Sequence, residues 1–260
     1  MNILFWNLAK HDNRQIVKSA ILNYSVDIAV FAEYSSTNME DLCNNLSSEY
    51  YICDGYGGCD KVIMIVKKGI IASVSREDTR YTLYFVEHNS VSYIIAGIHL
   101  PASPGADKET RKIVIRRLVH EIHELELEMK CNNTIVIGDY NASPFDEELI
   151  QKDCFNAVLF KDLIMKSESV KVAGSAFRRF YNPIITYINE NPKMYGSFYH
   201  SNGANSLYWY CLDQVIMRKS LIDSFIRLEY LRKIGNRSLM NNTGINDSIS
   251  DHLPLLVVFG

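Results

Sequence analysis

Short apolar runs recur along this sequence, and several of them stop at a polar residue. A continuous apolar run is typical of a strand that is covered on both faces. The runs and the residues that follow them are 3–6 with Asn7, 27–32 with Glu33, 92–98 with His99, and 134–137 with Gly138 and Asp139. Alternating or apolar patterns predict further strands over 61–67, 81–87, 207–217 and 256–259.

Helical periodicity, with apolar residues three and four positions apart, separates these strands. It predicts helices over 13–24, 37–46 and 106–130, a mostly helical segment over 147–166 and a helix near 221–228. In the longest of them the expected core-facing stripe is Ile113, Ile115, Leu118, Val119, Ile122, Leu125 and Leu127. Segments 166–206 and 232–250 are expected to be irregular. No repeat or linker interrupts the pattern, so residues 1–260 are expected to form a single α/β domain.

The polar residues at the strand ends are the first sign of function. Strand ends of a packed sheet meet at one edge, so these side chains are expected to converge on one cleft. Asp139 and Asn141 are two residues apart at the end of a strand and therefore face the same way. Asp213 lies in the 207–217 strand, and Asp251 and His252 precede the last strand. Each residue alone has an alternative role in a cap or a turn, but together they predict a site.

Such a cleft would gather several carboxylates, amides and imidazoles. Neighbouring carboxylates repel one another, so a hard divalent cation is expected among them. Oxygen ligands favour Mg²⁺ or Mn²⁺ over zinc. An imidazole beside a carboxylate, such as His252 beside Asp213, becomes more basic or cationic. These groups fit the attack of water on phosphorus, with a cation neutralising a phosphoryl oxygen.

Composition narrows the class of protein only in part. The chain is 47% hydrophobic and 22% charged, as in ordinary globular domains. Its net charge of −3 means that contact with a polyanion must come from a local patch. The six cysteines form no C-x-x-C pair, which is typical of a reducing compartment. With no leader and no apolar run of roughly 20 residues, a cytoplasmic protein without membrane contact is expected, although a secreted protein whose signal had been removed would look the same.

Six short motifs carry the polar residues. They are FWN with Asn7, FAEY with Glu33, GIHLP with His99, GDYNASP with Asp139 and Asn141, LDQV with Asp213, and SDHLP with Asp251 and His252. Together and in this order they resemble the motif set of the endonuclease/exonuclease/phosphatase superfamily, the relatives of pancreatic deoxyribonuclease and abasic-site exonucleases. Two positions depart from that set. Phe31-Ala32 stands where many members have Leu-Gln, and Gln214 stands where Tyr or Trp is common. Neither departure removes a catalytic group, but both weaken assignment to a subfamily.

The resemblance implies a fold and a metal site. The fold is a four-layer α/β sandwich, in which two mixed β-sheets pack face to face with helices outside. Glu33 would be the main metal ligand, with Asn7 and Asp251 near the same ion. That ion would be Mg²⁺, with Mn²⁺ as an alternative.

The resemblance also implies catalytic roles. Asp139 would orient or deprotonate the attacking water, and Asn141 would hold the scissile phosphate. His252, paired with Asp213, would contact a phosphate oxygen and stabilise the pentacovalent state. Accounts of the family differ over whether the histidine or the aspartate is the base. His99 would touch the phosphate or assist the leaving group.

Segment 166–206 suggests a nucleic-acid substrate, because aromatic residues and arginines are interleaved there. Such rings can stack on bases while arginines hold phosphates. Arg178, Arg179 and Tyr199 are therefore expected to bind substrate, although a packed loop with surface arginines explains the pattern equally well. The leading interpretation is a monomeric, Mg²⁺-dependent nuclease or phosphodiesterase. A small-molecule or lipid phosphate is an alternative substrate, and a catalytically silent binding module is an alternative of another class.

Overall fold

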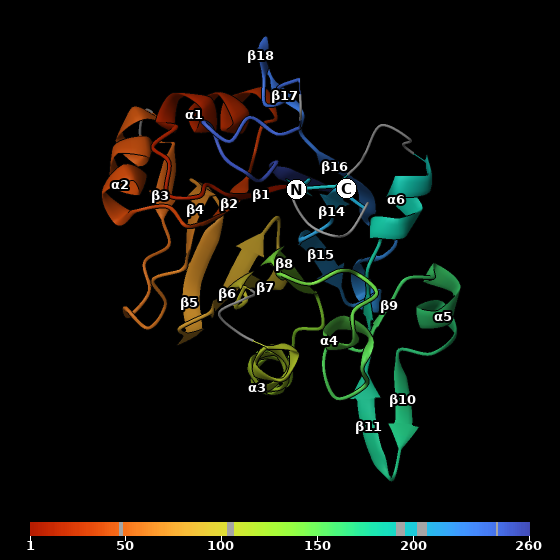
Figure 1. Ribbon diagram of the computed structural model, residues 1–260. Coiled ribbons are helices and arrows are strands. Elements are labelled where there is room, and N and C mark those ends of the chain that lie inside the picture. The colour runs from red at the N-terminus through yellow and green to blue at the C-terminus, as the bar shows by residue number, and fades with distance from the viewer. Residues whose placement is uncertain (47–48, 103–106, 191–195, 202–206, 243) are drawn as a thin grey trace.

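A computed structural model of the protein contains two large β-sheets, of six and seven strands, packed against each other (Figure 1). It describes residues 1–46, 49–102, 107–190, 196–201, 207–242 and 244–260. The six-stranded sheet has the order β16 (Phe225–Tyr230), β19 (Leu255–Phe259), β1 (Asn2–Asn7), β2 (Ile28–Ala32), β4 (Val62–Lys67), β3 (Tyr50–Ile52). The seven-stranded sheet has the order β5 (Ile71–Asp78), β6 (Tyr81–His88), β7 (Val91–His99), β8 (Thr134–Asp139), β15 (Asp213–Met217), β12 (Phe180–Tyr181), β9 (Ala157–Val158). Parallel pairs β1–β2, β7–β8 and β9–β12 stand among antiparallel ones, so both sheets are mixed.

Helices cover the outer faces of both sheets. One apolar core fills the space between the sheets, and a second lies between the seven-stranded sheet and α3 (Lys108–Glu128). Ile135 and Ile137 of β8 belong to the first core and Val136 to the second, because successive side chains of a strand point to opposite faces. Helices α1 (Arg14–Asn23) and α2 (Ser36–Asn45) lie against the six-stranded sheet (Figure 1). The predicted four-layer α/β sandwich is confirmed.

Shorter elements connect and flank the sheets. A hairpin of β10 (Ser169–Val172) and β11 (Ser175–Arg178) projects at the bottom of Figure 1. Two other small sheets pair β13 (Phe198–Tyr199) with β14 (Trp209–Tyr210), and β17 (Lys233–Ile234) with β18 (Arg237–Ser238). The short helices are α4 (Glu147–Ile150), α5 (Lys161–Lys166), α6 (Ile184–Glu190) and the 3₁₀ turn η1 (Lys219–Leu221). In the described ranges, no helix has the length and apolar character needed to cross a bilayer.

Several local predictions were wrong. Segment 147–166 holds only the short helices α4 and α5, with strand β9 between them. The helix expected near 221–228 is largely strand β16, which pairs with β19 at the edge of the six-stranded sheet. Strand β5 was not predicted, and the hairpin β10–β11 lies in a segment expected to be irregular. In each case pairing with distant strands or a local hairpin overrides an ambiguous pattern.

The stripe predicted for the long helix was partly wrong as well. Ile113 and Leu127 of α3 are exposed, whereas Arg111, Lys112 and Glu126 are buried. Each buried charge has an ion-pair partner on another element, such as Glu148 for Arg111 at 2.8 Å. Burial of a charge is tolerated when it is paired in this way.

Strand register brings the polar strand ends to one edge. Asp139 is the register partner of His99 in the parallel strand β7 and of Asp213 in the antiparallel strand β15. Because β15 runs against β8, its first residue lies beside the last residue of β8. A Cβ on Gly138 would lie 2.1 Å from the carbonyl oxygen of Ile98, so only glycine allows β8 to run this close to β7.

Candidate active site

Asp139 lies at the centre of a group of polar side chains from both sheets, and it is only 1% exposed. Its Oδ2 accepts a hydrogen bond from Nδ2 of Asn7 at 3.1 Å. The Nε2 atoms of His99 and His252 lie 3.7 Å and 4.0 Å from the same oxygen. Its Oδ1 accepts a hydrogen bond from the amide of Asn141 at 2.9 Å. Burial raises the pKa of Asp139 although both imidazoles oppose the shift, so this carboxylate is a stronger base than an exposed one.

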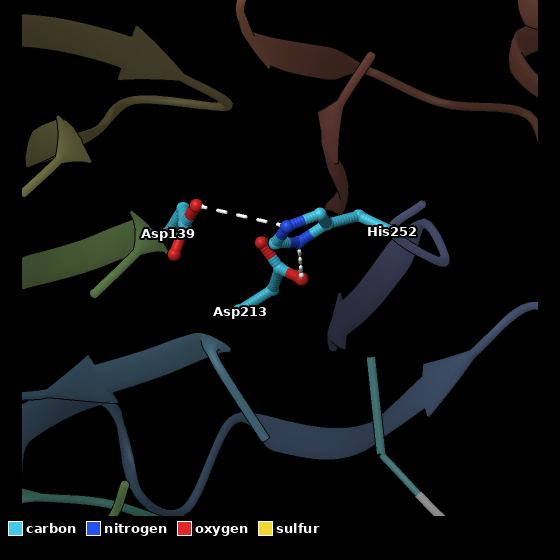
Figure 2. Close-up of side chains that lie close together, drawn as sticks. All are labelled: Asp139, Asp213 and His252. Carbon is cyan, nitrogen blue, oxygen red and sulfur yellow. Dashed lines mark hydrogen bonds and ion pairs between the residues drawn. The ribbon is translucent and has the colours of Figure 1, made fainter. Parts of the chain in front are cut away.

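Asp213 and His252 form a buried pair next to Asp139 (Figure 2). Oδ2 of Asp213 lies 2.7 Å from Nδ1 of His252. Burial alone lowers the pKa of His252, but the charge of Asp213, its hydrogen bond and the charge of Asp139 outweigh burial and raise the pKa to about 10. The ring is therefore cationic at neutral pH, with Nε2 on the side of Asp139.

The main chain around His252 is tied to the first strand. Ser250 Oγ accepts a hydrogen bond from the amide of His252 at 3.0 Å and donates one to the carbonyl of Asn7 at 2.7 Å. Nε1 of Trp6 donates to the carbonyl of His252 at 2.9 Å. These bonds join residues that are more than 240 positions apart and fix the imidazole relative to Asn7.

Glu33 and His99 meet on the other side of Asp139. Glu33 follows β2 with a left-handed φ of 50°, and its Oε1 lies 3.5 Å from Nε2 of His99. Burial lowers the pKa of His99 although Asp139 and Glu33 oppose the shift, so this ring is neutral at neutral pH. The Glu33 side chain is 28% exposed, and its one ion-pair contact in the described part of the chain is the one with His99. Its carboxylate is therefore available to a ligand.

Asn141 and Asp251 lie at the margin of the group. Nδ2 of Asn141 donates to the carbonyl of Leu100 at 2.9 Å, which leaves the second N–H of the amide as a donor. Asn141 has a left-handed φ of 47°, which asparagine tolerates better than most residues. Oδ1 of Asp251 lies 4.0 Å from Nε2 of His252, and the side chain is 49% exposed.

These side chains line one open cavity of about 480 Å³. Seven of the eight residues predicted for catalysis or metal binding face it, and they are Asn7, Glu33, His99, Asp139, Asn141, Asp251 and His252. The eighth, Asp213, is fully buried and reaches the cavity through His252. The structure therefore brings the predicted residues together, while the role of each one stays a prediction.

A mostly aromatic wall completes the cavity, formed by Phe198, His200 and Tyr210 together with the aliphatic Leu212. The ring centroid of Phe198 lies 5.0 Å from that of His252, and His200 stacks on Phe198 at 6.4 Å. Tyr199, which was expected to bind substrate, does not line the cavity and packs on Trp209 at 5.0 Å. Alternation along β13 explains the difference, because residues on either side of Tyr199 point the other way.

Comparison with known proteins identifies the fold that carries this site. No protein-family profile matches the sequence, and no curated protein matches it. Among solved structures, D. rerio TDP2 complexed with single strand DNA product has a TM-score of 0.61 at 12% identity, over 100% of this chain and 98% of that one. A mannosyl-6-phosphatase from Bacteroides thetaiotaomicron has a TM-score of 0.62 at 13% identity, over 100% and 99%. An endonuclease/exonuclease/phosphatase family protein from the same bacterium has a TM-score of 0.59 at 14% identity, over 100% and 98%. The chain has the endonuclease/exonuclease/phosphatase fold.

The possible ligand atoms in this cavity suit a hard divalent cation. Carboxylates of Glu33, Asp139 and Asp251 and the amide of Asn7 line the same cavity, and such ions prefer oxygen ligands. Possible ligand atoms of Asp139, Asp213 and His252 also lie within 4.8 Å of one another. That second group fits a cation poorly, because Nδ1 of His252 bonds Asp213 and a protonated ring has no free lone pair.

Arg178 and Arg179 do not lie in this cavity. Arg178 donates to Oε2 of Glu126 at 2.5 Å, and Oε1 of Glu126 accepts from Thr134 at 2.6 Å. Thr134 begins β8 and Asp139 ends it, so the carboxylate that Arg178 contacts lies at the opposite end of β8 from Asp139. Arg179 bonds a nearby main-chain carbonyl. Arg178 thus forms an ion pair with a buried carboxylate outside the cavity, which sequence patterns do not reveal, and its contact with substrate stays a prediction.

Proposed function

We propose that this chain is a divalent-metal-dependent hydrolase of phosphate esters. The observation that carries the proposal is the position of Asp139, whose buried carboxylate is within reach of Asn7 and of the two imidazoles of His99 and His252. A carboxylate held in this way suits the orientation of a water molecule, and a cationic ring beside it suits a phosphoryl oxygen. Hydrolysis at phosphorus requires both functions.

Each residue then has a chemical task. Asp139 orients the water and takes its proton, aided by the raised pKa that burial gives it. His252, kept cationic by Asp213, donates a hydrogen bond from Nε2 as negative charge grows on the phosphoryl oxygens. The remaining N–H of Asn141 holds the scissile phosphate. His99 contacts the phosphate or assists the leaving group.

Glu33 would be the main ligand of the cation, with Asn7 and Asp251 beside it. When Mg²⁺ or Mn²⁺ is bound, it supplies positive charge at a phosphoryl oxygen and at the leaving alkoxide. The Glu33 carboxylate supports this assignment, because it is part-exposed and faces the cavity. Asn7 supports it less strongly, since its Oδ1 already accepts from the amide of Ala9 at 3.0 Å.

The favoured substrate is a phosphodiester of nucleic acid. Phe198, His200 and Tyr210 place aromatic rings beside His252, and rings of this kind stack on bases. The structural likeness to a TDP2 complexed with single strand DNA product supports the same substrate class. The likeness to a mannosyl-6-phosphatase supports the second candidate, a phosphate ester of a small molecule.

A substrate panel separates these candidates. Single-stranded DNA, plasmid, RNA, a chromogenic phosphodiester and sugar, inositol and lipid phosphates would each be incubated with the protein in Mg²⁺ or in EDTA. We expect Mg²⁺-dependent cleavage of a polynucleotide. Turnover restricted to the sugar, inositol or lipid phosphates would favour the second candidate. Binding of any substrate without metal-dependent turnover would favour a catalytically silent binding module.

A further inference from the structure

Two cationic residues are joined through the main chain to Glu33 and His99, the residues that meet at the cavity. The amide of Lys10 donates to the carbonyl of Glu33 at 2.9 Å, and the carbonyl of Arg80 accepts from the amide of His99 at 2.9 Å. Residues joined by such bonds have Cα atoms about 5 Å apart. Lys10 belongs to the loop after β1, whereas Arg80 lies in the turn between β5 and β6. The two long side chains therefore start from different sheets at the same margin of the cavity.

The backbone before Lys10 holds that side chain at the margin. Ala9 lines the cavity, and Ala9 and Lys10 have left-handed φ values of 47° and 65°. This conformation is unfavourable for residues other than glycine and persists only where the surroundings impose it. Here the bond from Lys10 to Glu33 is one such constraint. The Lys10 side chain itself is exposed.

Arg80 lies beside the cavity, because its carbonyl accepts the hydrogen bond from the amide of His99. Arg80 is only partly exposed, and it forms no ion pair with any residue that the structure describes.

The acidic residues nearest in sequence to these cations have other partners. Asp12 pairs with Arg14 at 2.8 Å, and Asp78 pairs with Arg117 at 2.7 Å. Within the described ranges, Lys10 also lacks an ion-pair partner. Two unpaired cations at the margin of a cavity rich in carboxylates are suited to an anion that lies across the cavity mouth.

We propose that Lys10 and Arg80 bind phosphate groups that flank the scissile ester, so that the substrate is a strand with several phosphates rather than an isolated ester. This proposal rests on the proposed function and narrows its substrate class to a polynucleotide. The two residues bind the strand and take no part in the chemical step. Substitution of either residue is therefore expected to raise KM and to weaken the salt dependence of kcat/KM, while kcat stays unchanged.

The test uses Lys10→Gln and Arg80→Gln with matched controls. Lys130→Gln removes an exposed lysine that also has a left-handed φ of 50°, and Arg227→Gln removes an arginine that is 51% exposed. On a single-stranded oligonucleotide, each test variant should raise KM about five- to tenfold and reduce the salt slope of log kcat/KM by about 1. Neither test variant should change kcat/KM on a small chromogenic phosphodiester. The controls should match the wild type on both substrates.

Binding measured without turnover separates this proposal from the proposed function. Fluorescence anisotropy of a labelled oligonucleotide in EDTA should show a Kd raised by a similar factor in both test variants and unchanged in the controls. If the wild type hydrolyses small esters but the variants keep the wild-type KM and Kd for the oligonucleotide, the role of Lys10 and Arg80 is overturned. The proposed function then still stands. A wild type that hydrolyses no ester would overturn the proposed function, while the anisotropy result would still decide whether these residues bind the strand.

Discussion

Asp213 and His252 face each other with Oδ2 2.7 Å from Nδ1, and the carboxylate keeps the imidazole protonated. The second oxygen of Asp213 is buried and has no hydrogen-bond partner in the described part of the chain. The main electrostatic partner of this carboxylate is therefore His252. The pair links the start of β15 to the segment before β19, and so joins the two sheets at the site.

Asp213→Asn should remove the charge that keeps His252 cationic while it preserves the shape of the side chain. We expect kcat to fall by about 10²- to 10⁴-fold, the range found for loss of a positioned proton donor or acceptor. The measurement is the initial rate on a chromogenic phosphodiester at saturating Mg²⁺. Asp162→Asn, an exposed aspartate on α5, is the matched control and should keep the wild-type rate. A near-native rate for Asp213→Asn would contradict this role.

The same pair predicts that stability falls as the pH rises above neutrality. The folded pKa of His252 is about 10, raised from an ordinary value of 6.5. Its stabilising contribution is therefore complete below pH 6.5 and is lost as the pH rises towards 10. Between about pH 7 and 8, before cysteine thiols titrate, the free energy of unfolding in urea should fall by about 1 kcal/mol per pH unit. His252→Gln should abolish this slope, whereas His120→Gln, at an exposed position on α3, should retain it.

Glu33→Gln should weaken metal binding more than it alters the fold, because the Glu33 carboxylate is part-exposed and its contact with His99 spans 3.5 Å. We expect the Mg²⁺ concentration for half-maximal rate to rise at least about tenfold, as for the loss of one anionic ligand from an oxygen site. A titration of the initial rate with Mg²⁺ measures this. Glu87→Gln, an exposed glutamate on β6, is the control. An unchanged midpoint in Glu33→Gln would remove Glu33 from the ligand set.

Arg178→Gln should affect stability and leave substrate affinity alone. The substitution removes one partner of buried Glu126, which keeps its bonds to Arg218 and Thr134. We expect a loss of about 1–3 kcal/mol in the free energy of unfolding, measured in urea, and an unchanged KM on an oligonucleotide. Arg179→Gln, which loses only a bond to a main-chain carbonyl, should change both quantities little. A raised KM with native stability would restore the substrate-binding role expected from the sequence.

Sequence alone located the polar residues at the strand ends because their signals are local. Apolar runs that stop at Asn7, Glu33 and His99 fix both the strand and its last side chain. The position of Asp213 was less evident, since it begins a strand. Only the antiparallel pairing of β15 with β8 brings it to the same edge as Asp139.

Residues that depend on distant partners were not predictable. Arg178 is a residue type that commonly binds phosphate, yet its partner Glu126 is 52 positions away on helix α3. Phe198 and His200 line the cavity and Tyr199 does not, and the sequence does not reveal which face each residue of a two-residue strand presents. The segment that became β16 has apolar spacing that suits helix or strand, and pairing with β19 decides the outcome.

The claim that these side chains form one hydrolytic site is tested most directly at Asp139. The measurement is the initial rate of phosphodiester hydrolysis by the wild type and by Asp139→Asn, in Mg²⁺, in EDTA and after Mg²⁺ is restored. We predict a wild-type rate that disappears in EDTA and returns with Mg²⁺, and a rate for Asp139→Asn that is lower by at least about two to three orders of magnitude with native folding. Equal rates for the two proteins, or a wild type with no metal-dependent hydrolysis, would contradict the claim.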